Sequence, residues 1–125
     1  MVWSWTFYWY VSLLGACIQG EIPLTVQDTL LIQLRRHRTR AHSEWGLWQL
    51  RGKNLNGFCE HRFTVGGVQQ RPLGFFGPGR MEYTIVAYAT HKQKVYDPAG
   101  VFGTLTERRG HVQKYGGCKR VIKLD

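Results

Sequence analysis

Five side chains in the second half of the chain could together support acid–base chemistry on a phosphodiester. Arg62 and Arg71 can bind and neutralise a phosphate, while His91, Lys92 and Tyr96 follow a predicted strand and carry exchangeable protons. The set is rich in cations and poor in carboxylates, which suits cleavage of RNA without a metal ion. In that chemistry a base takes the 2′-hydroxyl proton, the oxygen attacks the neighbouring phosphate, and cations stabilise the transition state. Segment 90–94 taken alone is better explained by an ordinary polar strand exit.

The two arginines are expected to face one another across a hairpin. Gly66-Gly67 separates two strand-like runs, which predicts a tight two-residue turn. Counting outward from these glycines places Arg62 opposite Arg71, and like charges directly opposite destabilise a sheet. Either an anion, most simply a phosphate, lies between them, or both guanidinium groups extend into water, or Glu60 neutralises one of them.

The composition favours a polyanionic partner. Lys and Arg total 17 against 8 Asp and Glu, a net charge of +9 in 125 residues, with no Lys or Arg before Arg35. This length predicts a single domain over residues 1–125. Further cations that could join the same surface are Arg51 and Lys94.

The cysteines and histidines do not form a metal-binding pattern. Cys17, Cys59 and Cys118 are widely spaced, no CxxC pair exists, and the five histidines lack ligand spacing. We therefore expect buried thiols in a reducing compartment, with no disulfide, no metal and no cofactor.

The N-terminal segment, residues 1–18, has two interpretations. Its alternation of aromatic and polar residues predicts a first β-strand. The run ending at Cys17 also resembles a lipoprotein signal, which would make the protein lipid-anchored, but it lacks a positive n-region. The segment is too short and too polar for a transmembrane helix.

The remaining pattern predicts an α+β domain. Thr25 is the expected N-cap of a helix whose last turn is basic, and a short strand is expected at LWQLR, residues 47–51. Strands follow at about 58–65, 68–76 and 80–90, and Pro72 is expected to bulge the second of these or leave its edge open. Asp97-Pro98 predicts the start of a closing helix over about 98–112. The expected fold is a mainly antiparallel, twisted sheet of four to five strands with the helices packed on one face.

The order of several short motifs resembles the RelE/HigB-type toxin superfamily, specifically its phage-derived branch. LWQLR, EHRF, VQQRPLGFF and THKQKVYDP follow one another as that family's strand motifs do, over about residues 45–112, with 113–125 as a C-terminal tail or short strand. The resemblance implies a RelE-like fold and a bacterial, cytoplasmic toxin of a type II toxin–antitoxin system. Such a toxin cleaves mRNA on the ribosome without a metal and is inhibited by a cognate antitoxin protein.

The resemblance also implies roles for individual residues. Arg62 and Arg71 match the sheet arginines taken to bind the scissile phosphate, and His91 or Lys92 lies where the family places a basic residue. Tyr96 resembles a tyrosine that stacks on a base or orients the substrate. Lys53 is the one lysine in a loop that often holds several. This departure, together with Gln70 and Asp97 at positions where the family commonly has other residues, leaves efficient catalysis open.

A second function of a different class therefore stays open. The same fold is used by toxins that lack nuclease residues and act by occluding a target such as DNA gyrase. In neither case do we expect the protein to bind a membrane or a small-molecule cofactor.

Overall fold

The computed structural model of the chain describes residues 2–125. Within these residues the chain forms eight strands, two α-helices and four short 3-10 helices. In chain order they are β1 (Thr6–Tyr10), η1 (Ile18–Glu21), α1 (Leu24–His37), η2 (His42–Glu44), β2 (Trp48–Gln49), β3 (Phe58–Glu60), β4 (Phe63–Val65), β5 (Val68–Phe76), β6 (Glu82–Lys92), β7 (Val95–Asp97), η3 (Val101–Thr104), α2 (Leu105–Lys114), η4 (Gly116–Cys118) and β8 (Lys119–Val121).

The strands form one mixed, mostly antiparallel open sheet. β2, β3, β5, β6, β1 and β8 lie side by side in that order, while β4 pairs with β5 and β7 pairs with β6. Only β1 and β6 are parallel among the described strands. The expected α+β class is confirmed. The expected count of four to five strands is wrong, because β7 was not anticipated, the predicted strand 58–65 is divided into β3 and β4, and the C-terminal tail adds β8.

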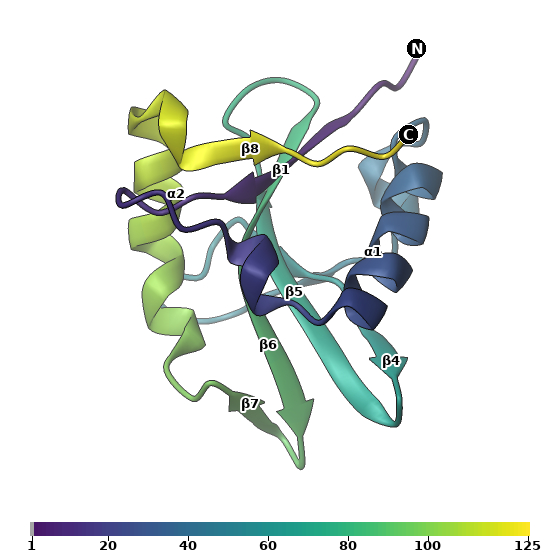
Figure 1. Cartoon of the computed structure of the whole chain (residues 1–125), viewed down its shortest axis with the longest axis vertical. Coiled ribbons are helices and arrows are strands. Elements are labelled where there is room, and N and C mark those ends of the chain that lie inside the picture. Colours follow the sequence, from purple (N-terminus) through teal and green to yellow (C-terminus); the bar gives the residue numbers. More distant parts are fainter. Residues whose placement is uncertain (1) are drawn as a thin grey trace.

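The two α-helices lie on opposite faces of the sheet (Figure 1). On one face the ring of His37 in α1 stacks on that of His61, with centroids 5.4 Å apart. On the other face the guanidinium of Arg109 in α2 lies 4.3 Å from the ring centroid of Phe58. Side chains alternate along a strand, so Phe58 and Glu60 point to this α2 face and His61 points to the α1 face. The prediction that both helices share one face is wrong. The central strand β6 is buried on both sides, so each face of the sheet is covered by a helix.

The hairpin predicted at Gly66-Gly67 is present. Both glycines have positive φ, 59° and 79°, as a two-residue hairpin turn requires. The ladder between β4 and β5 runs from Val65 opposite Val68 to Phe63 opposite Gln70, which is the register obtained by counting outward from the turn.

The same register continues through the interruption between β3 and β4. Glu60 pairs with Leu73 in the β3–β5 ladder, so the count across the gap places Arg62 opposite Arg71. The gap lies beside Pro72, which has no N–H to donate to a ladder. Of the two outcomes expected for this proline, the open ladder is the one found here.

A bulge does occur nearby, but in β6. Pro72 lies opposite Tyr88 in the regular part of the β5–β6 ladder, and the register shifts only between Leu73 and Gly74. Val86 is the extra residue at this shift, and its carbonyl accepts a hydrogen bond of 2.7 Å from Arg108 of α2. The bulge therefore gives α2 a fixed attachment to the centre of the sheet.

Both predicted helix starts are wrong. α1 begins at Leu24 after Pro23, and no side-chain hydrogen bond caps it, so Thr25 lies in the first turn. Asp97 pairs within the β6–β7 ladder, and α2 begins only at Leu105 after the turn η3. In residues 2–125, no helix combines the length and the apolar character needed to cross a bilayer.

The α1 face buries two histidines and a tyrosine without hydrogen-bond partners. His37 is 7 %, His61 2 % and Tyr83 0 % exposed. The Nε2 atom of His37, both ring nitrogens of His61 and the Tyr83 hydroxyl make no hydrogen bond within the described chain. Burial is the main cause that lowers the pKa of His37 to about 4 and the pKa of His61 to about 3. Both rings are therefore neutral in the folded protein near neutral pH.

This pair predicts a protein that loses stability in mild acid. Between pH 6.5 and pH 4 the unfolded chain binds protons at both histidines and the folded chain does not, so the free energy of unfolding falls as the pH falls. Each histidine should cost about 2 kcal/mol by pH 5, at about 1.4 kcal/mol per pH unit below its ordinary pKa. Urea unfolding at pH 7 and pH 5 measures this loss.

In the variant His61→Phe, the slope of the free energy of unfolding against pH should decrease by the contribution of about one proton. His42→Gln changes a histidine that is exposed to solvent and should leave the dependence as it is. An unaltered slope in His61→Phe would show that His61 is not buried in its neutral form.

Candidate functional site

The centre of the candidate site is the carboxylate of Glu60 in β3. Its side chain is fully buried, at 0 % exposure. It accepts a hydrogen bond of 2.7 Å from Nε of Arg62, and the Tyr96 hydroxyl lies 2.7 Å from its Oε2 and 3.0 Å from its Oε1. A buried carboxylate requires such donors, because an unpaired charge in the interior is strongly unfavourable. Glu60 therefore fixes one side chain from the β3–β4 connection and one from β7.

Arg71 is held next to this group by its own strand. It is 7 % exposed, Nη1 donates to the carbonyl of Gln70 at 2.8 Å, and Nη2 donates to Oε1 of Gln69 at 2.8 Å. Its Nε atom has no partner among the described residues. Arg71 lies opposite Ala89 in the β5–β6 ladder, so the neighbouring strand presents a small side chain at this position.

The same amide oxygen of Gln69 fixes the tautomer of His91. Nδ1 of His91 lies 3.1 Å from Oε1 of Gln69. Because Arg71 also donates to that atom, it must be the amide oxygen, and Nδ1 of His91 must carry the proton. In the neutral ring the lone pair then lies on Nε2, which has no hydrogen-bond partner within residues 2–125. His91 is half-buried and can exchange a proton with a bound molecule.

Tyr96 is a hydrogen-bond donor in this site and not a base. Burial, followed by the hydrogen bond to Glu60 and the charge of that carboxylate, raises the pKa of Tyr96 to about 12. Its ring packs on His91 at 4.8 Å and on Phe102 of η3 at 4.7 Å between centroids. Tyr96 therefore positions both Glu60 and the imidazole.

The structure decides two of the three explanations for the opposed arginines, namely neutralisation by Glu60 and extension of both groups into water. Arg62 is paired with Glu60, as the neutralising alternative required. Arg71 does not extend into water, because it is buried. The two arginines lie opposite one another on the α2 face, and an anion between them stays a prediction.

The structure separates the other predicted site residues from this group. His91 lies opposite Gln69 on the α2 face, so the next residue, Lys92, points to the α1 face. Lys94 is exposed in the β6–β7 turn. Arg51 and Lys53 are exposed in the connection from β2 to β3, whose Asn54 and Asn56 carbonyls accept hydrogen bonds from α2. Of the five predicted catalytic residues, four are brought together and Lys92 is not.

Three members of the site were not anticipated. Glu60 was considered only as a neutraliser of Arg62, and its contact with Tyr96 spans 36 positions of sequence. Gln69 was treated as an ordinary strand residue, although its amide connects Arg71 to His91. Trp48 was placed in a strand without a role, yet its ring lies 3.9 Å below the guanidinium carbon of Arg62. The β-strand alternation contained a signal for Gln69, because residues two apart share a face.

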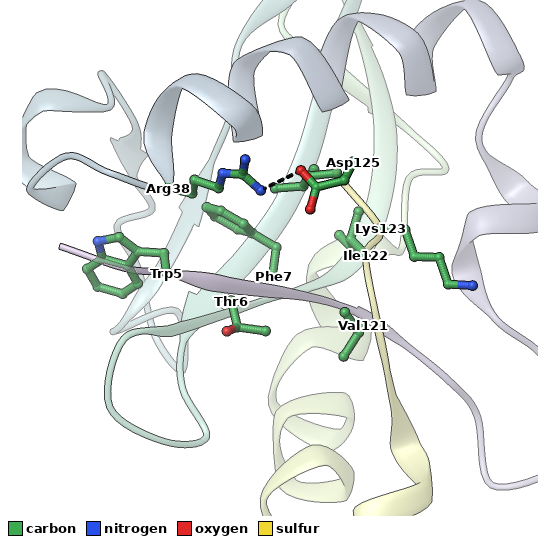
Figure 2. Close-up of a pocket in the computed structure, with 9 residues that line it drawn as sticks. Trp5, Thr6, Phe7, Arg38, Val121, Ile122, Lys123 and Asp125 are labelled. Atoms are coloured by element: carbon green, nitrogen blue, oxygen red, sulfur yellow. Dashed lines mark hydrogen bonds and ion pairs between the residues drawn. The ribbon is translucent and has the colours of Figure 1, made fainter.

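The larger of two pockets lies away from this group, and the smaller one overlaps its edge. A pocket of about 380 Å³ lies between β1, the end of α1 and the C-terminal segment, where Arg38 and Asp125 form an ion pair of 3.1 Å (Figure 2). A smaller pocket of about 240 Å³ lies at the two hairpin tips and is lined by residues that include Gln69, His91 and Lys92. The groups that can do acid–base chemistry therefore lie on an open surface next to the smaller pocket, which suits an extended polymer better than an enclosed small molecule.

Metal ligands do not gather in the described part of the chain. No group of three or more His, Cys, Asp and Glu side chains could hold an ion within residues 2–125, and the three cysteines are free. Comparisons of the chain with models of protein families, with curated proteins and with solved structures find no match. The interpretation of the site accordingly depends on its own geometry.

Removing the charge of Glu60 should destabilise the protein. We expect Glu60→Gln to lower the free energy of unfolding by about 1–3 kcal/mol, because a neutral amide replaces a buried acceptor of two side-chain donors. Glu107→Gln is the matched control, since that carboxylate is 74 % exposed and lies 3.7 Å from His111. Urea unfolding measures both, and equal stabilities would contradict the central position assigned to Glu60.

Proposed function

We propose that this chain is a RelE/HigB-type toxin of a type II toxin–antitoxin system and acts as a metal-independent, ribosome-associated mRNA endoribonuclease. The observation that carries the proposal is the convergence of Arg62, Arg71, His91 and Tyr96 on one exposed face of the sheet, around the buried carboxylate of Glu60. These groups come from four segments of the chain. Their types match the needs of phosphodiester cleavage.

In this proposal His91 is the general base. Nε2 takes the proton of a 2′-hydroxyl, the 2′-oxygen attacks the adjacent phosphorus, and the bond from phosphorus to the 5′-oxygen breaks. The leaving oxygen takes a proton from water, and the imidazole later returns its proton to solvent. The products are a 2′,3′-cyclic phosphate and a 5′-hydroxyl. The tautomer set by Gln69 keeps the lone pair on the accessible nitrogen.

The arginines supply positive charge to the phosphate as its negative charge increases. Arg62 uses Nε to bind Glu60 and keeps its terminal nitrogens for a ligand, and its side chain is 39 % exposed. Arg71 is buried and already hydrogen-bonded, so it contributes through its charge and its hold on Gln69. Such preorganised cations need no reorganisation when the transition state forms.

Composition and fold support the same proposal. The net charge of +9 favours association with RNA and with the ribosome. The order of strand, helix, antiparallel strands and helix is the order expected from the sequence. The proposal carries with it a cytoplasmic location and a cognate antitoxin whose acidic segment covers this basic face.

The test uses two variants of the site and one control. His91→Ala and Arg62→Ala should relieve growth arrest and lower the rate of mRNA cleavage on translating ribosomes, the first by about 100-fold or more, as expected for loss of a general base. Arg36→Ala removes an exposed arginine from α1, on the opposite face, and should leave cleavage unchanged. Mapping of the RNA ends should show 2′,3′-cyclic phosphates and 5′-hydroxyls. Arg71→Ala is a weaker test, because Arg71 is buried and its loss can disturb the fold.

Other outcomes assign the function differently. Full toxicity in His91→Ala, Arg62→Ala and their double variant would remove the catalytic assignment. Growth arrest with intact translation, together with a DNA-damage response and inhibited supercoiling by gyrase, would favour a toxin of this fold that acts by occlusion.

A further inference from the structure

Trp48 is an exposed aromatic residue with one face of its ring already covered. It lies in β2, at the edge of the sheet, directly opposite Glu60 in the β2–β3 ladder. The residue is 54 % exposed, which is far more than Trp5, Trp9 or Trp45, all of them buried. The guanidinium carbon of Arg62 lies 3.9 Å from the centroid of the indole. A cation over one face of an indole holds the ring in place and leaves the other face open.

Arg62 connects this indole to the candidate phosphate site. Its Nε atom is fixed at 2.7 Å from Glu60, so the guanidinium plane over Trp48 is fixed as well. Its terminal nitrogens have no hydrogen-bond partner in the described part of the chain and can donate to a phosphate. One arginine side chain therefore contacts both a phosphate position and an aromatic ring. A phosphate bound to its terminal nitrogens and a base stacked on the far face of the indole would therefore lie on either side of one guanidinium–indole pair.

We propose that Trp48 is a nucleobase-stacking subsite for single-stranded RNA. The indole face opposite Arg62 binds the base of a nucleotide next to the phosphate that Arg62 and Arg71 hold. This inference rests on the proposed function, because that function supplies the RNA substrate. It adds a base-binding position to a site that otherwise contacts only the backbone. Such stacking tolerates any base and contributes affinity, with a preference set by stacking strength.

The surroundings of Trp48 favour a nucleotide over a protein partner. An aromatic anchor of a protein interface is normally enclosed by apolar neighbours that exclude water. Here the side chain that contacts the indole is the cationic Arg62, and the exposed Arg51 lies three residues further along the sequence. Positive charge beside an open aromatic face is the combination that single-stranded nucleic-acid sites use.

The experiment measures binding without cleavage. The probe is a mixed-sequence RNA octamer with 2′-O-methyl groups throughout, which lacks the attacking hydroxyl. At fixed salt, Trp48→Ala should weaken binding by about 5- to 100-fold, the loss expected for one stacked base. Trp48→Phe should retain most of the affinity, because phenylalanine can still stack. It should also lose the component of tryptophan fluorescence that the octamer quenches in the wild type.

Three controls make the result specific. Gln49→Ala changes the neighbouring residue of β2, which points to the other face, and should bind as the wild type does. An octamer with abasic sugars should bind wild type and Trp48→Ala with equal affinity, because no base is present to stack. Arg36→Ala, the control on the opposite face, should keep the full affinity for the octamer.

The outcomes separate this inference from the proposed function. Unchanged octamer affinity in a folded Trp48→Ala variant would overturn the stacking subsite, even if the wild type cleaves mRNA. If that variant instead escapes neutralisation by the antitoxin, Trp48 contacts a protein and the inference is again wrong. Loss of octamer affinity in Trp48→Ala supports the subsite, even if the wild type does not cleave mRNA.

Discussion

The buried carboxylate of Glu60 is the interaction on which the arrangement of the candidate site depends. A charge removed from water must be compensated by nearby donors, and the two that compensate it come from different parts of the chain. Arg62 is thereby fixed over Trp48, and Tyr96 is fixed against His91. One acidic group thus connects the short strands β2, β3 and β7. It also keeps an arginine ordered that would otherwise sample many rotamers.

The two faces of the sheet differ in the charge state of the ionisable residues that they hold. His61 and Arg62 are adjacent in sequence, yet His61 points to the α1 face, where burial without partners keeps it neutral. Arg62 points to the α2 face, where its guanidinium group forms an ion pair with the carboxylate of Glu60. The α1 face therefore holds buried polar groups whose lack of hydrogen-bond partners lowers the stability of the fold. The α2 face holds the groups that can bind and react, and α2 leaves this end of the sheet uncovered.

The sequence predicted those features that local geometry determines. Two glycines with alternating residues on either side specify a hairpin, so the relation of Arg62 to Arg71 could be obtained by counting. The short strand β7 and the division of residues 58–65 into β3 and β4 were not predicted, because the pairing of such short segments is decided by the neighbouring strand and not by their own propensity. The role of Glu60 was inaccessible for a similar reason. Its partners are near in space and distant in sequence, and only the packed fold decides which donor reaches it.

The bulge at Val86 has a consequence for the chemistry that the strand presents. Before it, Ile85 lies opposite Gly74, and after it, Ala87 lies opposite Leu73, so the inserted residue reverses which side chains of β6 face α2. If Val86 were instead paired regularly with Leu73, the alternation would bring Lys92 to the site and send His91 to the other side. The nature of the proton acceptor, an imidazole instead of an amine, thus depends on whether a residue five positions away is bulged out of the ladder. Whether a residue has an odd or an even position along the strand can in this way decide which side chain acts in catalysis, independently of any residue that touches the substrate.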